Sequence, residues 1–223
     1  MATYSISKSF PWKGKITERV TTVCKMFGLT IKRLTEHNPV YRCRLEIEPG
    51  DIVYITGASG AGKSVLLSEL QKQFRAEESI NLADIELPDD KTVIDCLYRD
   101  ELLSADVTTL TGLQILSTAG LSDCFCILNQ PSNLSDGEKY RFRLAMAMAA
   151  GKKFIFADEF CSGLDRITAA SVSHKIRKFA DKTGTGFILA SSHCDTLLDL
   201  APDVLVRRYL SGKMDIVYKK SRR

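Results

Sequence analysis

Long hydrophobic runs are missing from this chain of 223 residues. A membrane-spanning helix needs roughly 18 apolar residues in succession, and the longest soft run, Leu144 to Ala150, is short and consists mostly of Ala and Met. The first residues, Met1 to Lys15, lack the apolar core of a secretory signal peptide. We therefore expect a cytoplasmic protein that does not itself insert into a membrane.

Closely spaced metal ligands are also scarce. Seven cysteines are scattered without a C-x-x-C pair, and the chain has three histidines. A zinc site needs such spacing, so the cysteines are better explained as buried free thiols in a reducing compartment. Nor is one sign of charge in large excess: 31 Lys and Arg against 27 Asp and Glu give a net charge of +4. That charge does not by itself require a nucleic-acid partner.

What the chain does contain is an alternation of short apolar runs and helical patterns. Runs typical of strands buried on both faces occur at Ile52 to Ile55, Phe154 to Ala157 and Phe187 to Ala190. Apolar residues at helical spacing occupy Lys63 to Arg75, Ser135 to Ala150 and Arg166 to Lys182, with Ile167 among the residues expected to face inward. Late strands are expected at Val204 to Val206 and Met214 to Tyr218. This order is typical of an α/β protein with a parallel central sheet.

The pattern differs before the first buried strand. Alternating apolar positions predict a half-buried strand in an antiparallel sheet beside the parallel one; they are Tyr41, Cys43, Leu45 and Ile47. Upstream, Thr17 to Phe27 has the spacing of an amphipathic helix, with Gly28 suited to end it. Short helices are expected between Thr92 and Gly120, one of them around Leu102 and Leu103.

A glycine-rich segment follows the first buried strand and begins the next helix. It reads Gly57-Ala58-Ser59-Gly60-Ala61-Gly62-Lys63-Ser64 and fits the phosphate-loop (Walker A) pattern G-x-x-x-x-G-K-[ST] in the required context. Glycines let successive backbone N–H groups face phosphates, and the helix N-terminus adds positive potential. Lys63 suits the β- and γ-phosphates, and the Ser64 hydroxyl suits Mg²⁺. The sequence predicts binding of nucleotide phosphates with Mg²⁺ by this segment and the adjoining Val65.

Two carboxylates end the strand Phe154 to Ala157. In α/β proteins the carboxyl ends of strands form the ligand-binding edge, so Asp158 and Glu159 are expected to face the phosphate loop. Asp158 suits Mg²⁺, and Glu159 suits polarising an attacking water. A third segment, Leu134 to Glu138, has Ser135 and Glu138 at capping-box spacing. Such a capped helix start is also a site for anions.

The order of these segments resembles the ATP-binding cassette (ABC) family. Leu134-Ser135-Asp136-Gly137-Glu138 looks like the signature loop of that family, usually LSGGQ, just upstream of the acidic (Walker B) motif. Ser162-Gly163-Leu164-Asp165 resembles the D-loop, and Ser191-Ser192-His193 resembles the segment of the switch histidine. The resemblance extends from Gly57 to His193. It implies a P-loop NTPase fold of ABC type, with an N-terminal antiparallel β subdomain and a short α-helical subdomain.

The resemblance also implies a division of one domain, residues 1–223. Residues 1–78 and 149–223 would form the nucleotide-binding core, and residues 79–148 the helical subdomain. Two chains would pair head-to-tail around two ATP molecules, with Ser135 and Gly137 of one chain contacting the γ-phosphate held by Lys63 of the other.

Further roles follow from the same resemblance. His193 would contact that γ-phosphate in cis, Asp165 would link the two sites, and Glu159 would be the catalytic base. The adenine would stack on an aromatic side chain, Phe27 or Tyr41. Phe27 is favoured because Gly28 follows it, although a core position on its helix explains Phe27 equally well.

The sequence departs from the family at several places. Asp136 and Glu138 replace a glycine and a glutamine of the signature, adding negative charge at the helix end. Asp84 and Glu86 stand where the Q-loop glutamine is usual, a loop that couples the ATP site of transporters to the membrane partner. The helical region is also shorter than transporters usually carry.

These departures favour an ABC ATPase with a soluble, non-transport role. The finer resemblance is to a group of ABC ATPases sometimes joined to an acetyltransferase-like domain, and the partner would be an unidentified protein or nucleic acid. Two alternatives remain open: the ATP-binding subunit of an ABC transporter, and a non-hydrolysing, ATP-gated clamp.

Overall fold

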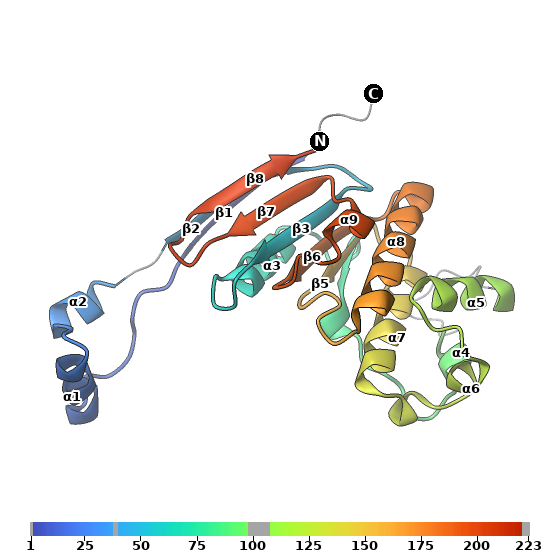
Figure 1. The fold of residues 1–223 in the computed structure, drawn as a ribbon, viewed down its shortest axis with the longest axis horizontal. Helices are drawn as coiled ribbons and strands as arrows, with labels where there is room; N and C mark the ends of the chain where they lie inside the picture. The colour runs from blue at the N-terminus through green and yellow to red at the C-terminus, as the bar shows by residue number, and fades with distance from the viewer. Residues whose placement is uncertain (1, 38–39, 98–107, 220–223) are drawn as a thin grey trace.

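The computed structural model describes residues 2–37, 40–97 and 108–219, and its central feature is a six-stranded sheet (Figure 1). The strand order is β4-β5-β6-β3-β7-β8. All neighbours are parallel except β8, which runs antiparallel to β7. The strands are β3 (Ile52–Gly57), β4 (Ser79–Asn81), β5 (Phe154–Ala157), β6 (Gly186–Ser191), β7 (Val204–Arg208) and β8 (Met214–Tyr218). The expected α/β fold with a parallel central sheet is confirmed.

A second, two-stranded antiparallel sheet covers one face. It consists of β1 (Ala2–Ser9) and β2 (Val40–Ile47). Helix α3 (Lys63–Gln71) completes this layer, and its buried leucines share one core with the inner faces of β2 and β3. Phe74 closes the end of this core: it stacks on Tyr4 at 4.5 Å and packs edge-on against Phe154 and Phe156.

Helices cover the other face of the large sheet. Buried residues of α7 (Asp136–Ala149) and α8 (Arg166–Thr183) form one core with β3, β5 and β6. Smaller helices extend this layer: α4 (Val93–Cys96), α5 (Thr109–Thr118), α6 (Cys124–Ile127), α9 (Leu197–Leu200) and the 3-10 segments Leu82–Asp84 and Pro131–Asn133. The expected helix around Leu102 and Leu103 lies outside the described residues. Ile167, expected to face inward, is exposed because it does not share the helix face of the buried Ala169, Val172 and Ile176.

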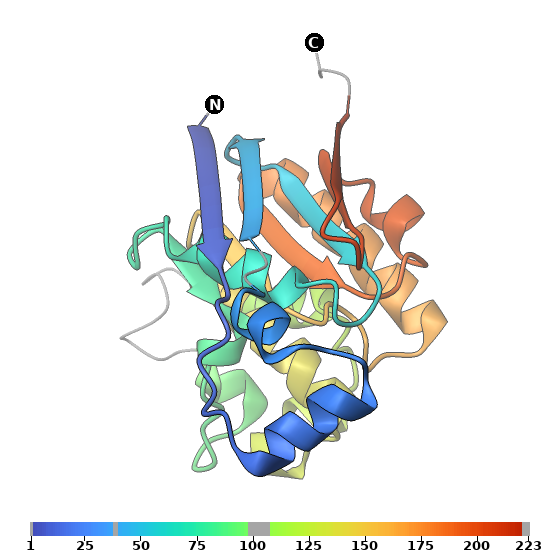
Figure 2. The same ribbon diagram turned by 90° about the vertical axis from the view of Figure 1, so that its left-hand side faces the viewer.

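The segment between β1 and β2 projects from the body (Figures 1 and 2). We call residues 10–39 the arm; it contains α1 (Glu18–Met26) and α2 (Ile31–Thr35). The predicted helix is confirmed, with Thr17 as N-cap and Gly28 at a positive φ of 64° just after Phe27. The core position for Phe27 is wrong, because 76% of this side chain is exposed.

The cysteines are free thiols as expected, but the expectation that they are buried is wrong for two of them. All seven cysteines are free, and five of them are buried; Cys124 and Cys194 are exposed. Within the ranges that the structure describes, no helix has the length and apolar character to cross a bilayer.

A buried arginine ties α8 to the large sheet. Arg177 donates to Asp203 Oδ2 at 2.6 Å and to Asp181 Oδ1 at 2.7 Å. The same Asp203 oxygen accepts from the backbone N–H of Ile52 at 3.0 Å, at the start of β3. The Arg177–Asp203 pair therefore fixes the helix relative to the strand that leads into the phosphate loop.

We expect Asp203→Ala to lower the free energy of unfolding by about 3–5 kcal/mol, because it leaves the buried Arg177 charge without one of its partners. Urea unfolding followed by circular dichroism measures the change. The control is Asp89→Ala at an exposed position, for which we expect a change within about 0.5 kcal/mol. Equal stability of the two variants would contradict the importance of this ion pair.

Candidate nucleotide site

The glycine-rich loop between β3 and α3 has the backbone geometry of a phosphate cradle. Gly57, Gly60 and Gly62 have φ values of 147°, 78° and 85°, which side-chain-bearing residues rarely adopt. A Cβ at Gly57 would lie 2.2 Å from the carbonyl oxygen of Arg208. The loop therefore requires glycine at this position both for its dihedral angles and for the close approach of β7.

The cation of this loop lies inside it. Lys63 is buried, and its Nζ donates to the carbonyl oxygens of Gly57 at 2.8 Å and Ala58 at 3.0 Å. Ser64 is exposed in the first turn of α3, next to the half-buried Val65. Lysine and hydroxyl thus stand together at a helix N-terminus, where backbone N–H groups and the helix dipole favour anions.

The acidic residues end a strand at the same edge of the sheet. The register pairs Tyr54 of β3 with Leu189 of β6, and Leu189 with Ala157 of β5, so the three parallel strands end within about three residues of one another. Asp158 follows Ala157 and is half-buried, whereas Glu159 is exposed. The phosphate loop and both carboxylates are therefore brought to one edge.

The turn after β5 has strained backbone. Glu159 and Cys161 have φ values of 48° and 57°, a region that is costly for residues other than glycine. Two hydrogen bonds hold the turn: the N–H of Phe160 donates to the carbonyl oxygen of Ala190 at 2.7 Å, and that of Cys161 to the Tyr140 hydroxyl at 3.1 Å. Strain of this kind persists where surrounding structure imposes it, often at functional sites.

His193 lies just beyond β6 and is exposed. Its backbone is fixed from both sides: its N–H donates to Ser191 Oγ at 3.2 Å, and its carbonyl oxygen accepts from the Tyr54 hydroxyl at 2.6 Å. Tyr54 is fully buried in β3, and its hydroxyl also lies 3.2 Å from Thr196 Oγ1. Burial raises the pKa of Tyr54, which keeps the phenol protonated as a donor.

Tyr54 and Tyr140 are positioning residues that the sequence analysis missed. Tyr54 is the one polar side chain in the apolar run Ile52 to Ile55, and a buried hydroxyl needs a hydrogen-bond partner. The need of the buried Tyr54 hydroxyl for a partner was the signal in the sequence that could have identified this residue. Tyr140 follows the signature-like loop on α7 and reaches the backbone of the turn after β5; no sequence pattern indicates that contact.

The start of α7 forms the predicted capping box. The backbone N–H and the hydroxyl of Ser135 donate to Glu138 Oε2 at 2.8 and 2.7 Å, and the N–H of Glu138 donates back to Ser135 Oγ at 3.4 Å. The Ser135 hydroxyl, followed by its backbone N–H, lowers the pKa of Glu138. The Glu138 carboxylate, which stands where the family usually has glutamine, is therefore ionised and hydrogen-bonded. The other added carboxylate, that of Asp136, is exposed.

The D-loop-like segment lies against this helix start. A Cβ at Gly137 would lie 3.4 Å from Leu164 Cδ2 and 3.7 Å from the carbonyl oxygen of Gly163. Asp165 acts as the N-cap of α8, with its Oδ1 accepting from the N–H groups of Ile167 and Thr168, both at 3.0 Å. Hydrogen bonds, first that of the Thr168 side chain, lower the pKa of Asp165.

Of the two aromatic candidates for the adenine, Phe27 does not lie beside the phosphate loop. Phe27 ends α1 in the arm, which stands away from β3 and α3 in Figure 1. Tyr41 belongs to β2, and its side chain lies outside the described part of the structure. The stacking residue stays a prediction.

Comparison with known proteins identifies the class. A family model described as ABC transporter matches residues 40–162, more than half of the chain. The chain therefore belongs to the ABC transporter family and is an ABC-type ATPase domain.

Two curated relatives show which proteins of this family the chain is similar to. The chain is 28% identical over 214 residues to the methionine import ATP-binding protein MetN of Haemophilus influenzae, covering 84% of this chain and 61% of that protein. It is 26% identical over 211 residues to MetN of Streptococcus agalactiae, covering 80% and 58%. The chain thus spans about three fifths of the length of the relatives it matches.

Solved structures share the fold. The dimeric structure of MJ0796, a bacterial ABC transporter cassette, superposes with a TM-score of 0.65 at 17% identity, covering 84% of this chain and 94% of that one. A nucleotide-free ATP-binding cassette from an ABC transporter gives 0.62 at 16% identity, covering 83% and 87%. The relatives fit the transporter alternative better than the non-transport role that the sequence favoured, and none of them indicates an acetyltransferase-like domain.

We expect Tyr54→Phe to lower ATP turnover about tenfold while lowering the free energy of unfolding by only about 1 kcal/mol. The substitution keeps the ring in the core and removes the hydroxyl that holds the backbone of His193. Steady-state ATPase assays and urea unfolding measure the two effects. Cys43→Ser, in the core beneath the other sheet, is the control for general destabilisation. Unchanged turnover in Tyr54→Phe would show that His193 needs no such support.

Proposed function

We propose that this chain hydrolyses Mg-ATP in a head-to-tail pair of identical subunits and uses the cycle to drive the membrane part of a transporter. The observation that carries the proposal is the convergence of the phosphate loop, the two carboxylates and His193 at the carboxyl ends of β3, β5 and β6. The names of the curated relatives support ATP binding and import.

Each group has a role that its surroundings allow. The Lys63 ammonium would neutralise the β- and γ-phosphates, and the Gly57 to Gly62 backbone would donate N–H groups to them. Mg²⁺ bound with a nucleotide needs only one or two protein ligands besides phosphate and water oxygens, and the Ser64 hydroxyl and Asp158 carboxylate fit that need. Glu159, exposed toward the edge, would accept the proton of the attacking water.

One subunit supplies only part of this site. The start of α7 at Ser135 lies apart from the phosphate loop between β3 and α3 (Figure 1). A second subunit, turned head-to-tail, would present its Ser135 and Gly137 to the γ-phosphate. The capping box leaves Ser135 engaged with Glu138, so binding a phosphate there would require that hydroxyl to change partner. Asp165 would lie at the same interface.

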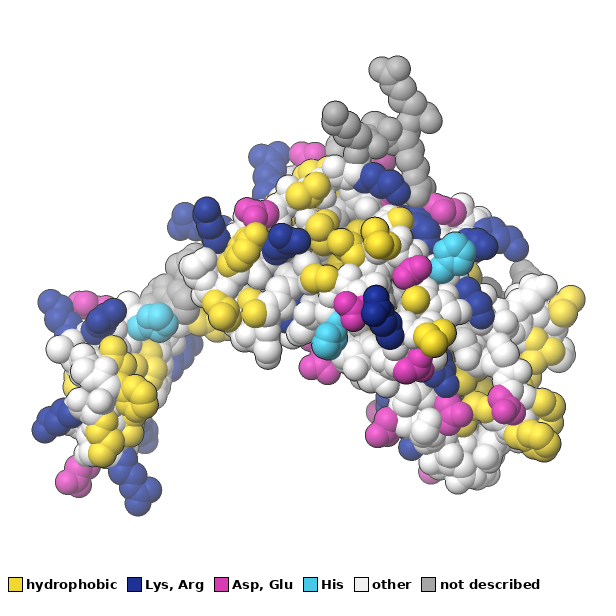
Figure 3. All heavy atoms as spheres, in the orientation of Figure 1, with side chains coloured by type: hydrophobic (Ala, Val, Ile, Leu, Met, Phe, Trp, Pro, Cys, Tyr) yellow, Lys and Arg dark blue, Asp and Glu magenta, His cyan; other side chains and the backbone are white. Residues whose placement is uncertain are grey.

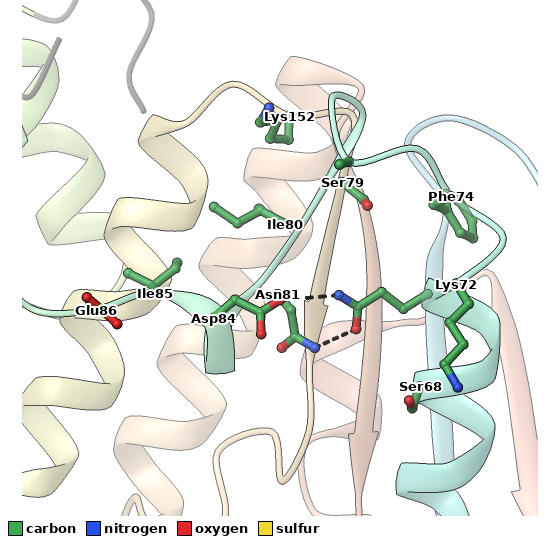
Figure 4. Close-up of a pocket in the computed structure, with 12 residues that line it drawn as sticks. Ser68, Lys72, Phe74, Ser79, Ile80, Asn81, Asp84, Ile85, Glu86 and Lys152 are labelled. Atoms are coloured by element: carbon green, nitrogen blue, oxygen red, sulfur yellow. Dashed lines mark hydrogen bonds between the residues drawn. The ribbon is translucent and has the colours of Figure 1, made fainter. Parts of the chain in front are cut away.

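A pocket beside α3 is where we propose that the membrane partner binds (Figure 4). Its volume is about 700 Å³, and its lining includes Asp84 and Glu86, which stand in place of the Q-loop. Gln71 bridges this segment to α3: its Oε1 accepts from Asn81 Nδ2 at 2.7 Å, and its Nε2 donates to Asp84 Oδ2 at 3.4 Å. A partner that displaces Asp84 would therefore pull on the helix that begins at Lys63 and Ser64.

The departures noted in the sequence bear on the non-transport role. The short helical region and the carboxylates in place of a Q-loop glutamine would suit a different partner. The pocket and the bridge through Gln71, however, give those same carboxylates a coupling position. The non-hydrolysing clamp has no observation in its favour.

The dimer is tested with two substitutions. We expect Glu159→Gln to bind ATP, to lower turnover by ~10²-fold or more, and to accumulate as a dimer, because it keeps the shape of the side chain and loses the base. Ser135→Arg should block the dimer by bulk and leave ATP binding to the single subunit intact. Light scattering with and without Mg-ATP measures both.

The control for nucleotide binding is Lys63→Ala, which removes the cation of the loop and should weaken ATP binding at least tenfold. A Glu159→Gln protein that stays monomeric at saturating ATP, or a monomeric Ser135→Arg protein that hydrolyses ATP normally, would contradict the head-to-tail mechanism.

The partner is tested at the pocket. We expect Glu159→Gln, loaded with ATP, to co-purify from detergent-solubilised membranes with a protein that has several membrane-spanning segments. Asp84→Lys with Glu86→Lys should abolish that recovery, whereas Lys182→Glu on the distant helix α8 should not. Recovery of a soluble protein or nucleic acid, dependent on the same two carboxylates, would support the non-transport role instead.

A further inference from the structure

The arm is a segment between β1 and β2 that lies outside both hydrophobic cores. It begins after the paired residues Ser9 and Val40 at the open end of the β1–β2 ladder, and its base is closed by the Trp12 N–H, which donates to the His37 carbonyl oxygen at 3.4 Å. Of the described residues 10–37, none belongs to either hydrophobic core. A helix as short as α1 is marginal without tertiary contacts, so a partner surface would stabilise it.

The arm exposes large apolar side chains close together in the sequence. Met26 and Phe27 are 77% and 76% exposed, and the other exposed ones are Phe10, Ile16, Val23 and Leu29. Figure 3 shows hydrophobic side chains gathered on the flank of the arm that faces the rest of the molecule, with Lys and Arg around them. Clustered exposed apolar residues mark interaction sites, whereas isolated ones do not.

The charges of the arm and of the helical subdomain are opposite. The described residues 10–37 contain six Lys and Arg and two Glu, whereas the described residues 79–97 and 108–148 contain eight Asp and Glu and four Lys and Arg. The small net charge of the whole chain conceals this separation. Opposite patches of this kind favour and orient association.

The helical subdomain also exposes large apolar side chains, on and beside α6. We call this surface the α6 tip. On and beside α6, Phe125 and Leu128 are 86% and 61% exposed, and the exposed Asp123 caps the helix. The exposed Asp95 lies on α4, which packs against α6. The tip thus combines large apolar side chains with carboxylates, as the arm combines them with cations.

The two surfaces cannot meet within one chain, because they lie at opposite ends of the molecule (Figure 1). Both extend to the side of the sheet on which the phosphate loop lies. In a head-to-tail pair the Ser135 end of one subunit faces the phosphate loop of the other. The helical subdomain of the second subunit then lies on the side of the core from which the arm of the first projects.

We propose that the arm of each subunit clasps the α6 tip of the other when ATP brings the pair together. The apolar side chains around Met26 pack against Phe125 and Leu128, and the arm cations lie beside Asp123 and Asp95. The clasp rests on the head-to-tail pair proposed above.

Cross-linking tests the contact directly. Met26→Cys in the Glu159→Gln background places a thiol in the arm, and the native Cys124 on α6 is exposed. A bifunctional thiol reagent should join the two subunits only when Mg-ATP is present. Adding Cys124→Ser should remove that product; if the product persists, Met26→Cys has reacted with another thiol and the clasp is wrong.

Affinity gives the second measurement. Met26→Ser and Phe125→Ser should each raise the Kd of the ATP-bound Glu159→Gln dimer about tenfold or more, and together they should raise it less than the product of the two effects. The control is Leu198→Ser on α9, where the side chain is 90% exposed and no effect is expected. ATP binding to the single subunit should be unchanged throughout.

The outcomes separate the clasp from the pair itself. A dimer of undiminished affinity in Met26→Ser and Phe125→Ser overturns the clasp and leaves the head-to-tail pair standing. A Glu159→Gln protein that binds ATP but never dimerises overturns both. If Met26→Ser instead loses ATP binding as a single subunit, the arm serves the nucleotide and the clasp is wrong.

Discussion

The packing of the parallel strands β3, β5 and β6 in a buried core is the constraint on which the rest of the molecule depends. β3, β5 and β6 are buried almost throughout, so their backbone groups must pair with one another, and that pairing sets their register. The phosphate loop, the turn at Asp158 and the turn at His193 begin where the strands end. Their mutual placement is therefore a consequence of the sheet, and none of them could shift without breaking hydrogen bonds that water cannot replace.

Buried hydroxyls transmit this rigidity to the exposed turns. Tyr54 reaches from β3 to the backbone of His193, and Tyr140 reaches from α7 to the strained turn at Cys161. Each forms a hydrogen bond in surroundings where an unpaired polar group would be costly, so each holds its turn in one conformation. The second contact also joins the helix of the signature-like loop to the turn after β5.

The pocket beside α3 and the arm are surface features that the packing of the core does not explain. Gln71, at the end of the helix that follows the phosphate loop, donates a hydrogen bond to Asp84 in the lining of the pocket beside α3. The arm and the helical subdomain carry opposite charge and extend to the same side. One chain alone leaves the pocket open and the arm exposed. Both features therefore suit contacts with other proteins.

Periodicity and motif order were enough to predict the strands at Ile52, Phe154 and Phe187, the helix capped by Ser135 and the phosphate loop, because each depends on local burial patterns, glycine and capping chemistry. The sequence alone also determined the class of site, since its residue types stand at fixed spacing. Only the tertiary structure decided that Val23, Phe27 and Ile167 are exposed, that Tyr54 and Tyr140 hold the turns, and that Phe27 stands apart from the loop. Helical spacing shows which residues share a face, but whether that face meets a core depends on what the rest of the chain places against it.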